Sequence, residues 1–92
     1  VAMTTLEMGS VPRLRRGVRL SYDQTRETHV LLFPEGVLVP NPTAAAVLSL
    51  CDGVEDVAAI ASALRERYAG VREEEILDVL SRLGDRRIVE WT

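Results

Sequence analysis

Residues 28–42 have the sequence THVLLFPEGVLVPNP, which combines a strand, a tight turn, a second strand and the start of a helix. Residues 28–33 are mostly β-branched or apolar, which is typical of a strand. Residues 34–36 are Pro-Glu-Gly, a turn sequence in which proline presets φ and glycine tolerates positive φ. The short apolar run at 36–39 therefore predicts a strand that returns alongside the first, and Pro40 ends it.

The same sheet extends upstream. Residues 18–22 alternate between apolar and polar types, as a half-buried strand does. The polar residues 23–27 then form a hairpin loop that leads to the strand at 28–33. Three strands joined by such short loops predict an antiparallel meander.

Downstream of Pro40 the spacing of the apolar residues changes to three and four, which indicates amphipathic helices. We expect these helices at about 42–51, 57–68 and 72–83, followed by a short strand at 88–91. Asn41 and Asp56 can cap the first two helices, and Gly84 is expected to stop the third. This order predicts an α+β fold in which a three-stranded antiparallel sheet is followed by a three-helix bundle, packed on one face of the sheet and winged-helix-like.

The chain has 92 residues, the length of one domain. Residues 1–11 show no apolar period, so we expect a flexible arm or linker there and a folded domain at 12–92. No apolar run approaches the roughly 20 residues that span a membrane, so no membrane partner is expected. Because Cys51 is the single cysteine, the expected location is the reducing cytoplasm.

The formal net charge is −3, and the acidic residues gather in the helical half. Residues 1–50 contain five Arg and four acids, whereas residues 51–92 contain six Arg and ten acids. Because a nucleic-acid interface needs a basic face, this balance argues against a nucleic-acid partner. One local basic cluster fits either a solvated face or a contact with an acidic partner segment. It consists of Arg13, Arg15, Arg16 and Arg19.

No catalytic or metal-binding set can be recognised, so we expect a protein that is not an enzyme and needs no metal or cofactor. His29 is the single histidine and stands in a strand, where a solvent-facing or edge position is the simplest interpretation. Cys51 continues the apolar face of the first helix, which predicts a small buried side chain rather than a nucleophile.

The strand at 36–39 indicates binding rather than chemistry. A small sheet has free backbone donors and acceptors at its edges, and this strand lacks the charges that usually protect an edge. An extended peptide can add to such an edge, with backbone hydrogen bonds for affinity and side-chain pockets for specificity.

Four segments are informative in combination. They are Pro12-Arg13-Leu14, Leu31-Leu32-Phe33-Pro34-Glu35-Gly36, Asn41-Pro42-Thr43-Ala44 and Leu48-Ser49-Leu50-Cys51-Asp52-Gly53. Together they resemble the PqqD family of pyrroloquinoline quinone (PQQ) biosynthesis, over about residues 12–92. Asp56 departs from the family pattern, which often has Thr there, but both residue types can cap a helix.

The resemblance implies a peptide chaperone, also described as a recognition element for ribosomally made, post-translationally modified peptides. Such a protein binds the precursor peptide PqqA and presents it to PqqE. PqqE is a radical S-adenosylmethionine (SAM) enzyme with iron–sulfur clusters that cross-links a Glu and a Tyr of the peptide. Some family members are fused behind PqqC, and a start without Met is compatible with such a fusion or with a cloning remnant.

In this class of domain the peptide adds as a strand to the third strand of the sheet, beside the third helix. The resemblance therefore implies that the peptide binds at Val37, Leu38, Val39, Arg72, Glu75, Ile76, Val79 and Leu83. The apolar residues of this set that belong to the third helix are expected to be mainly core residues, and to line the groove only at its margin.

Two other functions stay open. A winged-helix DNA-binding regulator would have a similar fold, although Glu73, Glu74 and Glu75 at the start of the third helix would repel phosphates. The second open function is a small enzyme that uses Cys51 and His29.

Overall fold

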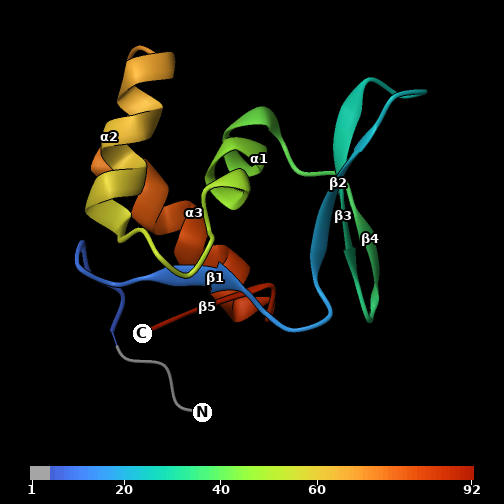
Figure 1. The fold of residues 1–92 in the computed structure, drawn as a ribbon, viewed down its shortest axis with the longest axis horizontal. Helices are drawn as coiled ribbons and strands as arrows, with labels where there is room; N and C mark the ends of the chain where they lie inside the picture. The colour runs from blue at the N-terminus through green and yellow to red at the C-terminus, as the bar shows by residue number, and fades with distance from the viewer. Residues whose placement is uncertain (1–4) are drawn as a thin grey trace.

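The computed structural model describes residues 5–92, and within them the chain forms two small sheets and three helices (Figure 1). In chain order the elements are β1 (Pro12–Leu14), β2 (Arg19–Asp23), β3 (Thr28–Phe33), β4 (Gly36–Leu38), α1 (Pro42–Ser49), α2 (Val57–Arg67), α3 (Glu73–Asp85) and β5 (Val89–Trp91). The predicted α+β fold is confirmed, because β2, β3 and β4 form a sheet that precedes the three helices.

The three-stranded sheet is the antiparallel meander that the sequence predicts, in the order β2-β3-β4. β3 therefore occupies its centre, and Leu31 of β3 lies opposite Leu38 of β4. In the loop between β2 and β3, the Asp23 carboxylate accepts hydrogen bonds from the backbone N–H groups of Thr25 and Arg26. This local bonding turns the chain back within a few residues.

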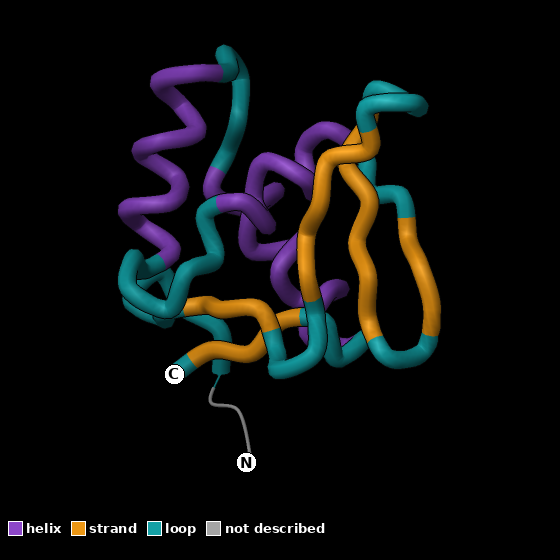
Figure 2. The backbone as a smooth tube through the Cα atoms, turned by 45° about the vertical axis from the view of Figure 1, so that its right-hand side comes forward, coloured by secondary structure: helices purple, strands orange, loops and turns teal. Residues whose placement is uncertain are grey.

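A second sheet joins the two ends of the domain, and Figure 2 shows it apart from the three-stranded sheet. β1 pairs antiparallel with β5, so that Pro12 lies opposite Trp91. The sequence predicts β5 but not β1, because a three-residue strand that begins with proline has no alternation to detect. β1 forms because β5, which is distant in the sequence, pairs with it. An ion pair of 2.6 Å between Arg13 and Glu90 joins the two strands.

Both predicted helix N-caps are present. The Asn41 side chain accepts a hydrogen bond from the N–H of Ala44, and the Asp56 side chain accepts one from the N–H of Ala59. Each cap satisfies a donor that the first turn of a helix leaves unpaired. α1 ends at Ser49, two residues before the predicted end. The N–H groups of Leu50 and Cys51 bond to carbonyls three residues back, instead of the four residues of an α-helix.

The prediction that Gly84 stops the third helix was wrong. α3 continues through Gly84 to Asp85, and Gly84 is buried there. The chain leaves the helical path at Arg87, which has a φ of 60°. The left-handed stop thus lies three residues later than the glycine that suggested it.

The helices pack around an aliphatic core to which every layer contributes. Leu31 of β3, Leu48 of α1, Ile60 of α2, Leu80 of α3 and Val89 of β5 are all buried in one cluster. α1 lies beside the three-stranded sheet, and α2 and α3 lie beyond it (Figure 1). This arrangement leaves β4 at the outer edge of the molecule.

The described part of the segment expected to be a flexible arm, residues 5–11, contacts the domain. The carbonyls of Met8 and Ser10 accept hydrogen bonds from the N–H groups of Ala58 and Val57. Those are first-turn donors of α2, so the segment supplies acceptors that the helix itself lacks. Residues 1–4, on which the rest of this expectation falls, lie outside the described residues.

Candidate functional site

β4 is an edge strand. In the described part of the chain it pairs with β3 alone, so one row of its backbone groups faces outward. Its side chains carry no charge, and Val37 is 63% exposed. Such an edge offers hydrogen bonds to an added strand.

The geometry of the hairpin decides which backbone groups face outward. β3 and β4 are joined by the two-residue loop 34–35, and such a loop closes on a hydrogen-bonded pair. That pair is Phe33 with Gly36, and hydrogen-bonded and non-hydrogen-bonded pairs then alternate along the strands. Leu38 therefore directs its N–H and C=O toward β3, whereas Val37 directs its own toward the free edge.

A hollow of about 300 Å³ lies between the end of β4 and the C-terminal half of α3. It is lined by Leu38, Val39, Pro40, Asn41, Ala44, Val79, Arg82, Leu83 and Arg86. Most of these side chains are apolar, and we call this hollow the edge groove.

The edge groove contains half of the residues implied by the family resemblance. Leu38 and Val39 come from the end of β4, and Val79 and Leu83 come from α3. Val37 lies next to the groove at the exposed outer edge.

The remaining implied residues lie elsewhere on α3. Ile76 is fully buried in the core, so it supports the helix from beneath. Arg72 is the N-cap residue of α3 and lies 3.4 Å from the Glu75 carboxylate. The structure therefore brings these residues to one helix but not into one hollow.

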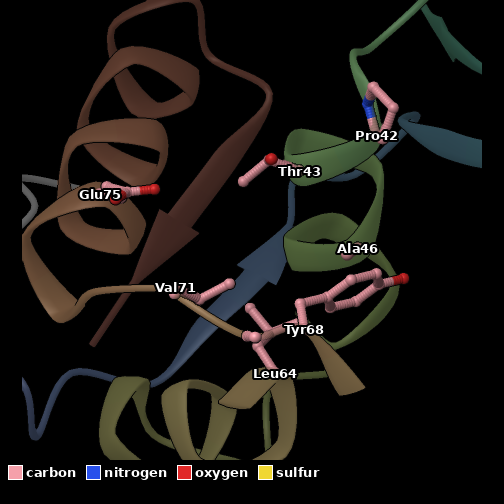
Figure 3. A pocket seen from close by; sticks show the side chains of 9 residues that line it. Pro42, Thr43, Ala46, Leu64, Tyr68, Val71 and Glu75 are labelled. Carbon is pink, nitrogen blue, oxygen red and sulfur yellow. The ribbon is translucent and has the colours of Figure 1, made fainter. Parts of the chain in front are cut away.

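Glu75 lines a second hollow, of about 250 Å³, where α1, α2 and α3 meet (Figure 3). In this view Leu64 and Tyr68 come from the end of α2, Ala46 comes from α1, and Glu75 points from α3 toward α1. Glu75 stands four residues before Val79, so the second hollow lies about one helical turn before the edge groove along α3.

Arginines 82 and 86 were not among the expected binding residues. Both line the edge groove. Together with Glu75, Val79 and Leu83 they occupy positions spaced by three and four, which lie on one face of a helix. That spacing was available in the sequence, but the face that looks toward β4 could not be identified without the fold.

Cys51 and His29 occupy structural positions. Cys51 is 6% exposed, and its thiol donates a hydrogen bond to the carbonyl of Val47. Burial, reinforced by the neighbouring Asp52 charge, raises the pKa of the Cys51 thiol to about 12. The His29 ring packs edge-on against Tyr22 at 5.1 Å between ring centroids.

The neighbouring Asp52 acts on the loop that follows α1. Its carboxylate accepts hydrogen bonds from the backbone N–H groups of Glu55 and Val54, and these bonds lower its pKa. This places Asp52 in a turn rather than at a reactive centre.

The described part of the chain, residues 5–92, contains neither a metal cluster nor a membrane-spanning helix. In that range no three His, Cys, Asp or Glu side chains gather closely enough to hold a metal ion. No helix there is both long and apolar enough to cross a membrane.

The chain is similar in sequence and in fold to proteins of one family. Residues 28–89 match the family described as "Coenzyme PQQ synthesis protein D (PqqD)". A PqqA binding protein of Pseudomonas aeruginosa (strain UCBPP-PA14) is 46% identical over 80 residues, which are 85% of this chain and 87% of that protein. A PqqA binding protein of Azotobacter vinelandii is 40% identical over 91 residues, 96% of this chain and 98% of that protein.

A solved structure is similar over nearly the whole chain. It is the solution NMR structure of the PqqD truncation of Methylobacterium extorquens PqqCD, described as a functional, stand-alone RiPP recognition element. The two chains are 41% identical with a TM-score of 0.78, covering 95% of this chain and 96% of that one. From the family match, the relatives and this shared fold, it follows that the chain belongs to the PqqD family of coenzyme PQQ synthesis proteins.

Proposed function

We propose that this chain binds the precursor peptide PqqA along the free edge of β4 and presents it to the radical SAM enzyme PqqE. The observation that carries the proposal is an uncharged edge strand beside an apolar groove. The names of the relatives support PqqA as the peptide, because those proteins are PqqA binding proteins.

The edge of β4 supplies the backbone part of this interaction. Val37 offers one N–H and one C=O outward, enough to exchange two hydrogen bonds with one residue of an added strand. Because these bonds involve only backbone, they would hold a peptide of any sequence.

The edge groove supplies the side-chain part. Alternate side chains of the added strand would point toward α3 and contact Val79 and Leu83. Ile76 would keep α3 in place from within the core, and Arg72 and Glu75 would lie near one end of the peptide.

This geometry supports a role in presenting the peptide to a second protein rather than in converting it chemically. A peptide held by one edge keeps its ends and its outer face free for a second protein. We therefore assign the chemistry to PqqE and a binding role, without a cofactor, to this chain. We place this step in the cytoplasm, and the PqqCD truncation supports a further association with PqqC.

A titration of the isotope-labelled protein with PqqA tests the binding. We expect backbone amide shifts at residues 36–40 and along α3, and few at β2, which forms the opposite edge of the sheet. Absence of shifts with PqqA in excess would exclude the proposal, and a parallel titration with duplex DNA would then test the regulator alternative.

A second measurement separates presentation from binding. The rate at which PqqE cross-links PqqA is compared with and without this chain at equal enzyme and peptide concentrations. An increased rate is expected. If PqqA binds but the rate is unchanged, binding stands and presentation is excluded.

A further inference from the structure

The charges that line the edge groove differ from those of the whole molecule. The chain has a formal net charge of −3, yet the titratable residues of the groove are Arg82 and Arg86, with no Asp or Glu among the lining residues. An acidic protein thus presents a cationic patch beside the uncharged edge strand β4.

Arg82 and Arg86 are available to a ligand. The Arg82 guanidinium lies 3.1 Å from the Asp78 carboxylate, but its side chain is 77% exposed, so this pair is weak and easily shared. Arg86 makes no ion pair within residues 5–92. Both side chains stand on the groove face of α3, next to Leu83.

We infer that Arg82 and Arg86 bind a carboxylate side chain of the docked peptide, two residues away from an apolar side chain seated on Val79 and Leu83. The inference rests on the proposed function and names the peptide class that the groove selects. It adds a charge requirement to the backbone bonds, which by themselves do not distinguish sequences.

The spacing of two follows from strand geometry. Successive side chains of an extended peptide alternate between two faces, so residues i and i+2 both point toward α3, roughly 7 Å apart. Val79, Arg82, Leu83 and Arg86 follow one another on the groove face of α3. A peptide residue on the apolar pair therefore places its second neighbour beside an arginine.

The carboxylate belongs to a side chain rather than to the end of the peptide. Arg82 and Arg86 line the same hollow as Leu38, the last residue of β4, and Val39, which follows it. A peptide that covers β4 has its chain passing this point, where it can offer a side chain.

The test measures binding of fluorescently labelled PqqA to the full chain by anisotropy. In the variant Arg82→Glu/Arg86→Glu the affinity should fall about tenfold or more, since two favourable contacts become repulsive. The matched control is Arg19→Glu/Arg26→Glu, which makes the same change of charge on β2 and its loop, at the opposite edge of the sheet. Its affinity should stay within about twofold of the wild-type value.

Peptide variants then identify the partner group. Each Asp or Glu of PqqA is changed in turn to the corresponding amide. One of these changes should weaken binding to the wild-type chain. The same change should not weaken binding to Arg82→Gln/Arg86→Gln, because the partner of the lost carboxylate is already absent there. Lys at that peptide position should restore binding to the Arg82→Glu/Arg86→Glu variant. A C-terminally amidated PqqA should bind as tightly as the free acid.

The outcomes are separable from those of the proposed function. Failure of the wild-type chain to bind PqqA would exclude the proposed function itself. Tight binding of PqqA to a folded Arg82→Glu/Arg86→Glu variant would overturn the charge requirement alone. Loss of binding only on C-terminal amidation would overturn the assignment to a side chain, because the required carboxylate would then be the end of the peptide. Circular dichroism of each variant confirms that it is folded.

Discussion

Replacement of Val37 by proline should weaken peptide binding while leaving the fold intact. Proline removes the backbone N–H that Val37 directs to the free edge, and its ring occupies the space where a peptide carbonyl would lie. The pairing of β4 with β3 uses the backbone groups of Leu38, so it does not lose a hydrogen bond. The Val37 side chain is 63% exposed, so little packing is lost with it.

The expected magnitude follows from the number of bonds. One outward residue exchanges two hydrogen bonds with an added strand, each worth about 0.5–1.5 kcal/mol net. Loss of one bond and distortion of the other should cost about 1.4 kcal/mol, which is a tenfold increase in Kd. Leu38→Pro should show the opposite pattern, a loss of folding stability, because its N–H faces β3.

The assay is a titration of labelled PqqA followed by anisotropy, with circular dichroism and urea unfolding for each variant. Val37→Ala is the matched control, since it shortens the side chain but keeps the N–H. The hairpin geometry, and with it the edge-strand model, would be refuted if folded Val37→Pro bound PqqA as tightly as Val37→Ala.

Three further residues give testable outcomes. Cys51 should react with a thiol reagent at pH 8 only after unfolding, because burial raises its pKa to about 12; a rate in the native state equal to that in urea would contradict this. Since the ordinary pKa of a cysteine thiol is 9.0, the unfolded thiol ionises first, so the stability present below pH 9 should decline as pH rises toward 12 in urea titrations, relative to Cys51→Ala. Ile76→Ala should lower the free energy of unfolding by about 2–5 kcal/mol, because the side chain is fully buried. At temperatures where that variant is folded its PqqA affinity should change less than about twofold, because the buried Ile76 side chain shares no contact with the peptide, and a larger loss would indicate that Ile76 contacts the peptide directly. Gly53→Ala should cost roughly 1–2 kcal/mol in the same unfolding measurement, because Gly53 has a φ of 78° and an added Cβ would lie 3.4 Å from the Arg13 Cβ; an unchanged midpoint would show that the loop relaxes.

Local signals in the sequence were enough for most of the elements. The strand at 28–33 has the predicted bounds, and the caps at Asn41 and Asp56 begin the helices where expected, because each depends on neighbouring residues alone. β1 and the contacts of residues 5–11 could not be predicted in the same way. Both depend on partners that are distant in the sequence, Glu90 and the first turn of α2.

The candidate site was predictable at the strand and less so at the helix. An uncharged run at 36–39 indicated an open edge, and the structure places β4 at one. On α3 the apolar spacing could not separate Ile76, which faces the core, from Val79, which reaches the groove. The two arginines of the groove were missed because charged residues on a helix are usually solvated, and only the position of β4 distinguishes them.

The pairing of β1 with β5 has a consequence for how the polypeptide can be rearranged. Val11 and Thr92 exchange backbone hydrogen bonds of 3.0 and 3.2 Å, so the two ends of the domain lie side by side, away from β4 (Figure 1). Joining Thr92 to the start of the chain through a linker, so that residues 5–10 keep their contacts with α2, and opening the chain in the loop at 23–27 should give a circular permutant with the same core. For the same reason, a polypeptide attached after Thr92 would leave from the end of the molecule that lies away from the docking edge.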